Sequence, residues 1–258
     1  GIVGTSTALE RSYLRLHFAP DPATIRPPPV LSKALSLVKT KWLNEADYAH
    51  AQEQLMSIQQ DCRLQGVEGS LACDAYETNT RIALEKGDLA ELSRCLSSLA
   101  ELYHKAEMAQ ACWSPNTNEF VAYRILHAMR GEADMLQKTT SAIWELTPAQ
   151  RKDTDVQFAM AVGQAVIGED LESFFRLYTE APKMAGYVID FFVDRVRAKA
   201  LQAYIRACQP ELCIDALKTM LRFNKRKECF RFLRDKNVVF SADKRFVDCK
   251  ASKALFTP

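Results

Sequence analysis

The sequence predicts a mainly α-helical protein, in which a solenoid of helical hairpins (TPR-like) is followed by a C-terminal winged helix with a small β-hairpin. Apolar residues recur every three or four positions through most of the 258 residues, and no alternating run of comparable length competes with them. The nine glycines are about half the usual share, which leaves few residues suited to a strand-rich fold or to phosphate-binding loops.

The composition is that of a globular chain with one sizeable core or two smaller ones, since 48% of the residues are hydrophobic and 26% are charged. The longest weakly polar run, residues 156–167, is well short of the ~20 residues that span a membrane. No basic and apolar leader is visible at the start, and the first residue is Gly1 instead of Met. We therefore expect a domain excised from a longer protein, with no membrane partner.

Residues 1–29 are expected to form an N-terminal helix and a proline-rich strap, ahead of a helical-repeat solenoid over 30–207 and a winged-helix subdomain over 208–258. Five of the ten prolines lie within residues 20–29, so this segment is expected to be extended. Two roles remain open for it. In the first, which we favour, it closes the apolar end of the solenoid. In the second, it presents a second basic area made of Arg11, Arg15 and Arg26.

The solenoid helices follow from stripes of apolar residues at helical spacing. One stripe runs from Tyr48 to Cys62, and a second, unbroken, runs from Leu89 to Tyr103. The same spacing predicts further helices over residues 120–129, 135–146, 156–167, 171–178 and 188–205.

Three similar turns separate these helices, each with a glycine followed by an aspartate. The glycine is expected to end one helix in the left-handed conformation, and the aspartate is expected to cap the next helix. The aspartates are 46 and 36 residues apart, which fits stacked helical hairpins of ~35–45 residues. The turns are Gly87-Asp88, Gly131–Asp134 and Gly168–Asp170.

After Pro210 the pattern changes. A short helix over residues 214–221 and a second over 225–236 precede two short strands, 238–240 and 246–247, which are joined by a polar turn. Helix, helix and hairpin are the order of a winged helix, a relative of the helix-turn-helix.

The charge is distributed unevenly along the chain. The net charge of +2 divides into −8 for residues 1–194, with 18 basic and 26 acidic residues, and +10 for residues 195–258, with 16 basic and 6 acidic residues. A segment this basic is a candidate contact surface for nucleic acid or for an acidic partner.

The strongest functional signal is the predicted helix 225–236. At 100° per residue, Lys227, Arg231 and Arg234 lie within about 60° of one another, and apolar residues occupy the opposite side. The alternative is a solvated face, or one that meets acidic residues of a partner or of this chain. We favour RNA or DNA, because +10 exceeds what solubility requires. The predicted nucleic-acid-binding residues are Lys225, Arg226, Lys227, Arg231, Arg234, Lys244, Arg245, Lys250 and Lys253.

Catalysis and metal binding have little support. The sequence has no P-loop, GxSxG, HExxH or dinucleotide fingerprint, and neither a CxxC nor the paired Cys and His spacing of a zinc site. His104 and Cys112 are near in sequence but are not expected to form a catalytic pair. The eight cysteines are expected to be reduced and mostly buried. We expect no enzyme activity, cofactor, metal or small-molecule substrate.

Three tryptophans, Trp42, Trp113 and Trp144, are further candidates, because an exposed indole ring can stack on a nucleic-acid base. Trp144 lies within an apolar stripe, so it is expected in the core.

Several segments resemble a known family, and they follow its order over almost the whole chain. They are Glu10–Leu16, Ala19–Pro22, Arg26-Pro27, Tyr76-Glu77, Arg81–Asp88, Asn118–Phe120, Ala122–Leu126 and Val247–Lys250. On these residues the chain resembles the germinal-centre-associated nuclear protein (GANP) type of PCI domain, and within it the branch containing leukocyte receptor cluster member eight. The polar entry to the winged helix, Glu211–Cys213, departs from the more hydrophobic family pattern.

The resemblance implies a right-handed superhelix of helical repeats that ends in a winged helix, without catalytic activity or cofactor. It implies a second PCI-domain protein bound through the winged helix, where we expect contacts from Leu212, Phe240, Phe246 and Val247. It also implies a small acidic Sem/Dss-type subunit in the same assembly.

Such modules act in the nucleus on messenger RNA. The resemblance therefore implies a non-catalytic nuclear scaffold subunit that contributes to RNA or DNA binding in mRNA processing, transcription elongation, splicing or export. The alternative is a PCI subunit of a proteasome-lid, signalosome or translation-initiation assembly with purely protein–protein function.

Overall fold

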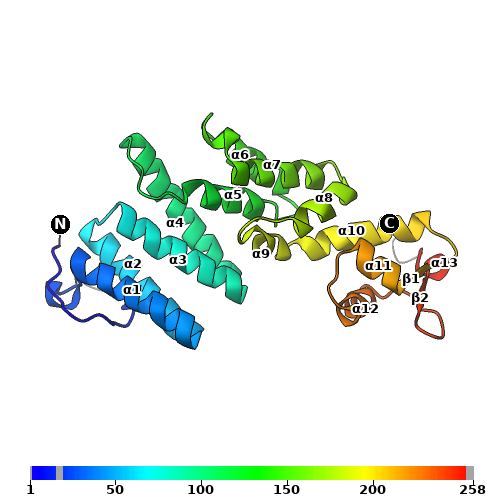
Figure 1. Ribbon diagram of the computed structural model, residues 1–258, viewed down its shortest axis with the longest axis horizontal. Helices are drawn as coiled ribbons and strands as arrows, with labels where there is room; N and C mark the ends of the chain where they lie inside the picture. The colour runs from blue at the N-terminus through cyan, green and yellow to red at the C-terminus, as the bar shows by residue number, and fades with distance from the viewer. Residues whose placement is uncertain (1, 16–19, 254–258) are drawn as a thin grey trace. The chain divides into compact units, whose positions relative to one another are not determined.

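The computed structural model describes residues 2–15 and 20–253; Leu16 and Ala19 of the opening motif lie outside them. As the sequence predicts, the described residues are mainly helical, and they include one small two-stranded sheet (Figure 1). The chain forms two compact units, residues 1–124 and 125–258. The predicted divisions after residues 29 and 207 do not coincide with this boundary and stay predictions.

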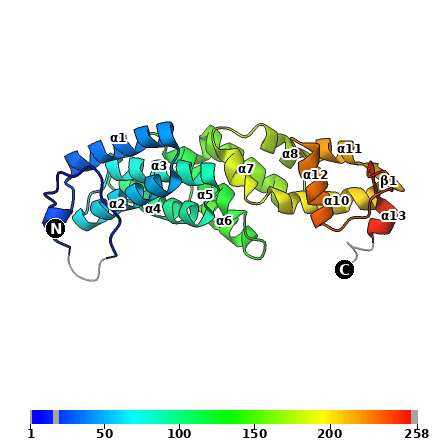
Figure 2. The ribbon, with the colours of Figure 1, turned by 90° about the horizontal axis from the view of Figure 1, so that it is seen from below.

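The first unit is a set of paired helices joined by short turns (Figure 2). The first four helices pack in sequence, α1 on α2, α2 on α3 and α3 on α4. The apolar stripes that begin at Tyr48 and Leu89 lie on α2 and α4 as predicted, whereas no predicted range covers α1. The elements are η1 (Pro22–Thr24), α1 (Pro28–Glu45), α2 (Tyr48–Gln65), α3 (Ser70–Lys86), α4 (Leu89–Met108) and α5 (Thr117–Ala128), which extends into the second unit.

The turn at Gly87-Asp88 has the predicted geometry. Gly87 has a φ of 70°, in the left-handed region that strains any residue with a Cβ. The Asp88 side chain accepts a hydrogen bond from the Glu91 backbone N–H at 2.9 Å and so caps α4. This turn therefore closes the α3–α4 hairpin as the sequence predicts.

Two segments of the family-like motifs supply buried polar contacts between α3 and its neighbours. Glu77 on α3 accepts hydrogen bonds from the Tyr103 hydroxyl at 2.8 Å and from the Asn116 amide at 2.9 Å. Arg81, one turn further along α3, pairs with Glu119 of α5 at 3.1 Å. Both glutamates are buried, so their partners fix the register of α4 and α5 on α3.

The N-terminal segment is tied to α2 by ion pairs. Arg26 is fully buried, and its Nε donates to Asp61 Oδ2 at 2.7 Å, while Arg11 Nη1 lies 2.8 Å from Asp61 Oδ1. Residues 2–15 form no helix, so the predicted N-terminal helix is wrong for them. The predicted extended segment also ends early, because Pro28 and Pro29 form the first turn of α1. Proline suits this position, where the N–H groups have no intrahelical acceptor.

The second unit continues with paired helices and ends in a small substructure with two strands. Its elements are α6 (Met135–Trp144), η2 (Gln150–Lys152), α7 (Thr154–Ile167), α8 (Leu171–Thr179), α9 (Ala185–Asp190), α10 (Val193–Ala207), β1 (Glu211–Cys213), α11 (Ile214–Met220), α12 (Arg226–Asp235), β2 (Phe246–Asp248) and α13 (Cys249–Ser252). The predicted continuous helix 188–205 is wrong, because it breaks between α9 and α10. At this break the buried Phe192 packs against Phe174, with ring centroids 6.2 Å apart.

Two of the predicted left-handed glycines are wrong. Neither Gly131 nor Gly168 has a positive φ, and at the later turn the left-handed residue is Glu169, with a φ of 54°. Asp170 still caps α8 by accepting a hydrogen bond from a backbone N–H of the first turn. The Asp134 side chain makes no cap hydrogen bond and pairs with a lysine one turn along α6 instead.

Trp144 lies at the surface, which contradicts its predicted place in the core. It is 77% exposed at the end of α6. Thr139 and Ala142 are the buried residues of this helix, and at 100° per residue Trp144 lies about 140° or more from either of them. The apolar residues of this stretch therefore do not all lie on one face.

The cysteines differ in their expected reactivity. Cys112 is exposed, whereas Cys62, Cys73 and Cys95 are buried, and burial raises the pKa of each of these three thiols to about 12. At pH 8 we expect a thiol-specific reagent to label Cys112 first and these three only after unfolding. Peptide mapping by mass spectrometry measures the order. Labelling of Cys62 in the native protein as fast as Cys112 would contradict the packing of α2.

Candidate nucleic-acid interface

The C-terminal part of the second unit contains α11, α12 and a hairpin in the predicted order. Its sheet pairs β1 with β2 in antiparallel orientation, with Leu212 opposite Val247. Phe240, from the first predicted hairpin strand, joins Val247 only through an isolated bridge. The prediction lacks β1, since three residues with one central apolar side chain are too few to show a strand period.

Helix α12 has the predicted two faces. Cys229, Phe232 and Leu233 are buried, as the helical spacing predicts. Lys227 and Arg231 are exposed on the other side. Apolar packing of one face therefore holds α12 in place and leaves its cationic side chains in solvent.

Two contacts fix the hairpin against the start of α12. Phe230 of α12 stacks on Phe240 of the hairpin, with ring centroids 4.8 Å apart and an interplanar angle of 25°. Arg226 donates from Nε to Asp215 Oδ1 of α11 at 2.9 Å and from Nη2 to the Lys244 carbonyl oxygen at 3.4 Å. Arg226 thus connects α11, α12 and the hairpin, and part of its hydrogen-bonding capacity is already used.

The hairpin tip is shaped by an aspartate. The Asp243 carboxylate accepts hydrogen bonds from the Ser241 hydroxyl at 2.7 Å and from the Arg245 backbone N–H at 3.1 Å. These hydrogen bonds, the one from Ser241 first, lower the pKa of Asp243. These hydrogen bonds therefore hold the backbone of Lys244 and Arg245 in one conformation, while both side chains remain exposed.

A hollow of about 420 Å³ lies between the first turns of α12 and this hairpin tip. We call it the hairpin hollow. Four basic side chains and one acidic side chain line it, together with the half-buried ring of Phe230. The lining residues are Arg226, Lys227, Phe230, Asp243, Lys244 and Arg245.

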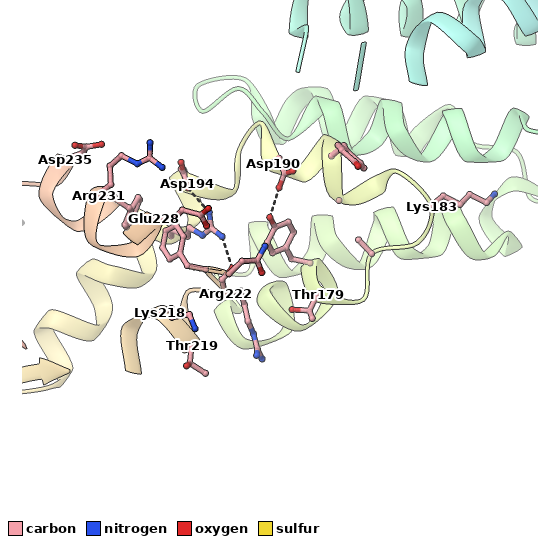
Figure 3. Close-up of a pocket in the computed structure, with 18 residues that line it drawn as sticks. Thr179, Lys183, Asp190, Asp194, Lys218, Thr219, Arg222, Glu228, Arg231 and Asp235 are labelled. Atoms are coloured by element: carbon pink, nitrogen blue, oxygen red, sulfur yellow. Dashed lines mark hydrogen bonds and ion pairs between the residues drawn. The ribbon is translucent and has the colours of Figure 1, made fainter. Parts of the chain in front are cut away.

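A second and larger hollow, of about 970 Å³, lies on the other side of α12, between it and the segment from α8 to α11 (Figure 3). We call it the mixed hollow, because carboxylates and cations line it together. Figure 3 shows Arg231 beside Glu228 and Asp235 on α12, with Lys218 and Arg222 across from them. Asp190 and Asp194 add two further carboxylates, so this hollow has no strong excess of either charge.

The structure thus separates the predicted nucleic-acid-binding residues. It brings Arg226, Lys227, Lys244 and Arg245 together at the hairpin hollow and places Arg231 at the mixed hollow. The remaining four, all exposed, line neither hollow: Lys225, Arg234, Lys250 and Lys253. Phe230 was not among the predicted residues. It lies three and four residues after Lys227 and Arg226, and this spacing places it on the same side of the helix as they are.

The residues predicted for the partner interface do not form one exposed surface. Val247 is fully buried, so its predicted place at an interface is wrong and it belongs to the core of the C-terminal substructure. Its burial follows from its position in β2, opposite Leu212 and bridged to Phe240. Leu212, Phe240 and Phe246 are half-buried, and each keeps some exposed surface.

The second basic area expected near the N-terminus is wrong. Arg26 is fully buried and the Arg11 side chain is 12% exposed, and both pair with the one carboxylate of Asp61, so neither offers a free cationic surface. Only Arg15 of the three predicted residues is exposed. The ion pairs hold the segment on α2, and its role in closing the apolar end of the solenoid stays a prediction.

The remaining candidates form no site in the part of the chain that the structure describes. Cys112 Sγ donates to the Ser114 carbonyl oxygen at 3.4 Å, and His104 lies on α4. No three His, Cys, Asp or Glu side chains among residues 2–15 and 20–253 gather as a metal site requires. No helix among the described residues is both long and apolar enough to cross a membrane.

Comparisons with known proteins agree with the order of the motifs. The SAC3/GANP family model matches residues 11–242. The chain is 39% identical over 257 residues to the leukocyte receptor cluster member 8 homolog of Xenopus laevis, an alignment that covers 98% of this chain and 31% of that protein. It is 37% identical over 243 residues to a THP3 homolog of Schizosaccharomyces pombe, covering 93% of this chain and 59% of that protein.

A third relative, SAC3 family protein A of Arabidopsis thaliana, is 37% identical over 222 residues, which are 86% of this chain and 21% of that protein. The chain therefore spans less than two thirds of each of these relatives. The family match covers most of the chain, and two relatives are aligned over more than nine tenths of it. The family that the motifs predict is confirmed, and the chain belongs to the SAC3/GANP family.

Proposed function

We propose that this chain is a non-catalytic scaffold subunit of a nuclear assembly that acts on messenger RNA, and that its C-terminal winged helix contacts RNA or DNA. The family to which the chain belongs supports the role as a scaffold. The hairpin hollow supports the contact with nucleic acid, because basic residues of α12 and basic residues of the hairpin line the same hollow of about 420 Å³. This arrangement is the single observation that carries the proposal.

The chemistry of the hollow suits a polyanion. Lys227, Lys244 and Arg245 are exposed and come from two elements that Phe230 and Arg226 hold together. Lysine and arginine at such positions neutralise phosphates and release counterions, which makes binding steeply dependent on salt. Without any base-reading residues in view, sequence-independent affinity of ~10⁻⁴–10⁻⁶ M is expected for this chain alone.

Pairing with a second PCI-domain protein, and with a small acidic Sem/Dss-type subunit, is part of the same proposal. The exposed parts of Leu212, Phe240 and Phe246 lie on the hairpin and its sheet, and they offer apolar area for such a partner. A partner docked there would extend the basic surface or cover it. The alternative, a proteasome-lid, signalosome or translation-initiation subunit without nucleic-acid contact, is less well supported because the family match is to SAC3/GANP.

Neutralising the hairpin tip tests the contact. In Lys244→Gln/Arg245→Gln we expect affinity for a labelled RNA to fall roughly 20-fold at 0.1 M salt, and the slope of log K against log salt to become shallower by about 1.4. Two lost phosphate contacts account for both effects. Fluorescence anisotropy over a range of salt concentrations measures them.

The matched control removes two positive charges from other exposed sites. Lys33→Gln/Lys152→Gln changes the net charge by the same amount, and both side chains are exposed and remote from the hairpin in sequence. We expect its affinity to stay within about twofold of that of the unmodified chain, because it removes no local phosphate contact. Equal losses in the two variants, or no RNA binding by the unmodified chain, would contradict the proposed function.

A further inference from the structure

The hairpin hollow combines cations with an aromatic ring. Phe230 lines it beside Lys227 and Lys244, and one side of the ring already stacks on Phe240. Aromatic rings within basic grooves bind single strands, because an unpaired base can stack on the ring while the cations hold its phosphates. In a duplex the bases are paired and stacked on one another, so the ring would have no base to receive.

The two flanks of α12 differ in charge. The hairpin hollow has four basic side chains and one acidic side chain, whereas in the mixed hollow four carboxylates, including Glu228 and Asp235 of α12, offset five basic side chains. A helix inserted in the major groove of a duplex, ~12 Å wide, has a phosphate strand on each side. One of those strands would then lie on the mixed hollow, where Glu228 and Asp235 offset the attraction of Arg231 and the other basic side chains. A single strand needs only the basic flank.

From these two observations we propose that the hairpin hollow binds single-stranded nucleic acid in preference to duplex, with an unpaired base on Phe230 and phosphates on Lys227, Lys244 and Arg245. This inference rests on the proposed function and specifies its substrate class. The volume of about 420 Å³ lies within the ~300–1,000 Å³ range of pockets that hold small organic ligands, so it is large enough for one nucleotide unit.

The test compares three probes of one sequence: a single-stranded RNA, a single-stranded DNA and an RNA duplex, each about 16 nucleotides long. By anisotropy at low salt, we expect both single strands to bind the unmodified chain about tenfold more tightly than the duplex. The RNA and DNA arms show whether the 2′-hydroxyl contributes. In Phe230→Leu, we expect single-strand affinity to fall about fivefold or more and duplex affinity to fall by no more than about twofold, the part that comes from loosening the hairpin.

Phe240→Leu is the matched control, because it removes the same ring–ring contact without altering a lining residue of the hollow. Because this contact positions the hairpin cations for every probe, we expect a loss of at most about twofold that is equal for single strand and duplex. A second variant, Glu228→Gln/Asp235→Asn, is expected to raise duplex affinity about fivefold, because it leaves the basic side chains of the mixed hollow with fewer carboxylates to offset them. Circular dichroism confirms that each variant is folded.

The outcomes separate this inference from the proposed function. Absence of binding to all three probes overturns the proposed function itself. Binding in which the duplex is as tight as the single strands, or in which Phe230→Leu and Phe240→Leu behave alike, leaves the nucleic-acid contact in place and overturns the single-strand assignment.

Discussion

Replacing Asp61 with asparagine is expected to lower the free energy of unfolding of the first unit by about 3–5 kcal/mol. Asp61 is fully buried and faces two guanidinium groups, Arg26 at 2.7 Å and Arg11 at 2.8 Å. Asparagine has nearly the same shape but no charge, so the variant leaves the fully buried Arg26 without a counterion. The energetic cost comes from that uncompensated charge, more than from the hydrogen bonds that are lost.

Urea unfolding followed by circular dichroism measures this effect, and hydrogen exchange in α2 and residues 2–15 locates it. Glu68→Gln provides the control, since it breaks the Lys105–Glu68 pair at 2.6 Å, whose side chains are 56% and 42% exposed. An exposed pair contributes only ~0–1 kcal/mol. If the two substitutions destabilise the protein equally, the ion pairs of Asp61 do not hold the N-terminal segment.

Helices were predictable where the sequence carries a long apolar period, and their ends were predictable only in part. Gly87 takes the predicted left-handed φ, but at the related turn Glu169 takes it instead of Gly168. A glycine permits a left-handed conformation without requiring it, so its position shows only that a turn is near. Packing decides which residue adopts it, as it also decides the break beside Phe192, where the apolar period itself continues.

The candidate site was predictable to a similar degree. Helical spacing was sufficient to place Lys227 on an exposed face, and the order of elements was sufficient to place Lys244 and Arg245 beside α12. The burial of Val247 was not predictable, because it depends on pairing with β1, which is three residues long. The burial of Arg26 was not predictable either, because nothing in the proline-rich segment indicates that its partner is Asp61, 35 residues further along the chain.

The orientation of α12 depends on an arginine that no motif indicates. Arg197 on α10 is 8% exposed and donates to the carbonyl oxygens of Leu221 and Arg222, both at 2.9 Å. Its guanidinium also lies 3.8 Å from the ring centroid of Phe223, which in turn packs on Phe232 of α12 at 5.3 Å. Arg197 thus satisfies the C-terminal end of α11 and supports the loop from which α12 starts.

We expect Arg197→Ala to lower the free energy of unfolding by about 2–4 kcal/mol, since it leaves two carbonyl groups unsatisfied and removes the cation from the Phe223 ring. Arg197→Lys should recover less than half, because an ammonium cannot reach both carbonyls and stack on the ring at once. Asp194→Ala is the control: it removes the Arg197–Asp194 pair at 2.9 Å, but the aspartate side chain is 69% exposed, so its cost should be at most about 1 kcal/mol. Thermal unfolding of the three variants measures the order. Equal stability of Arg197→Ala and Asp194→Ala would show that the carbonyl and ring contacts contribute nothing, and α12 would then be oriented by its buried apolar face alone.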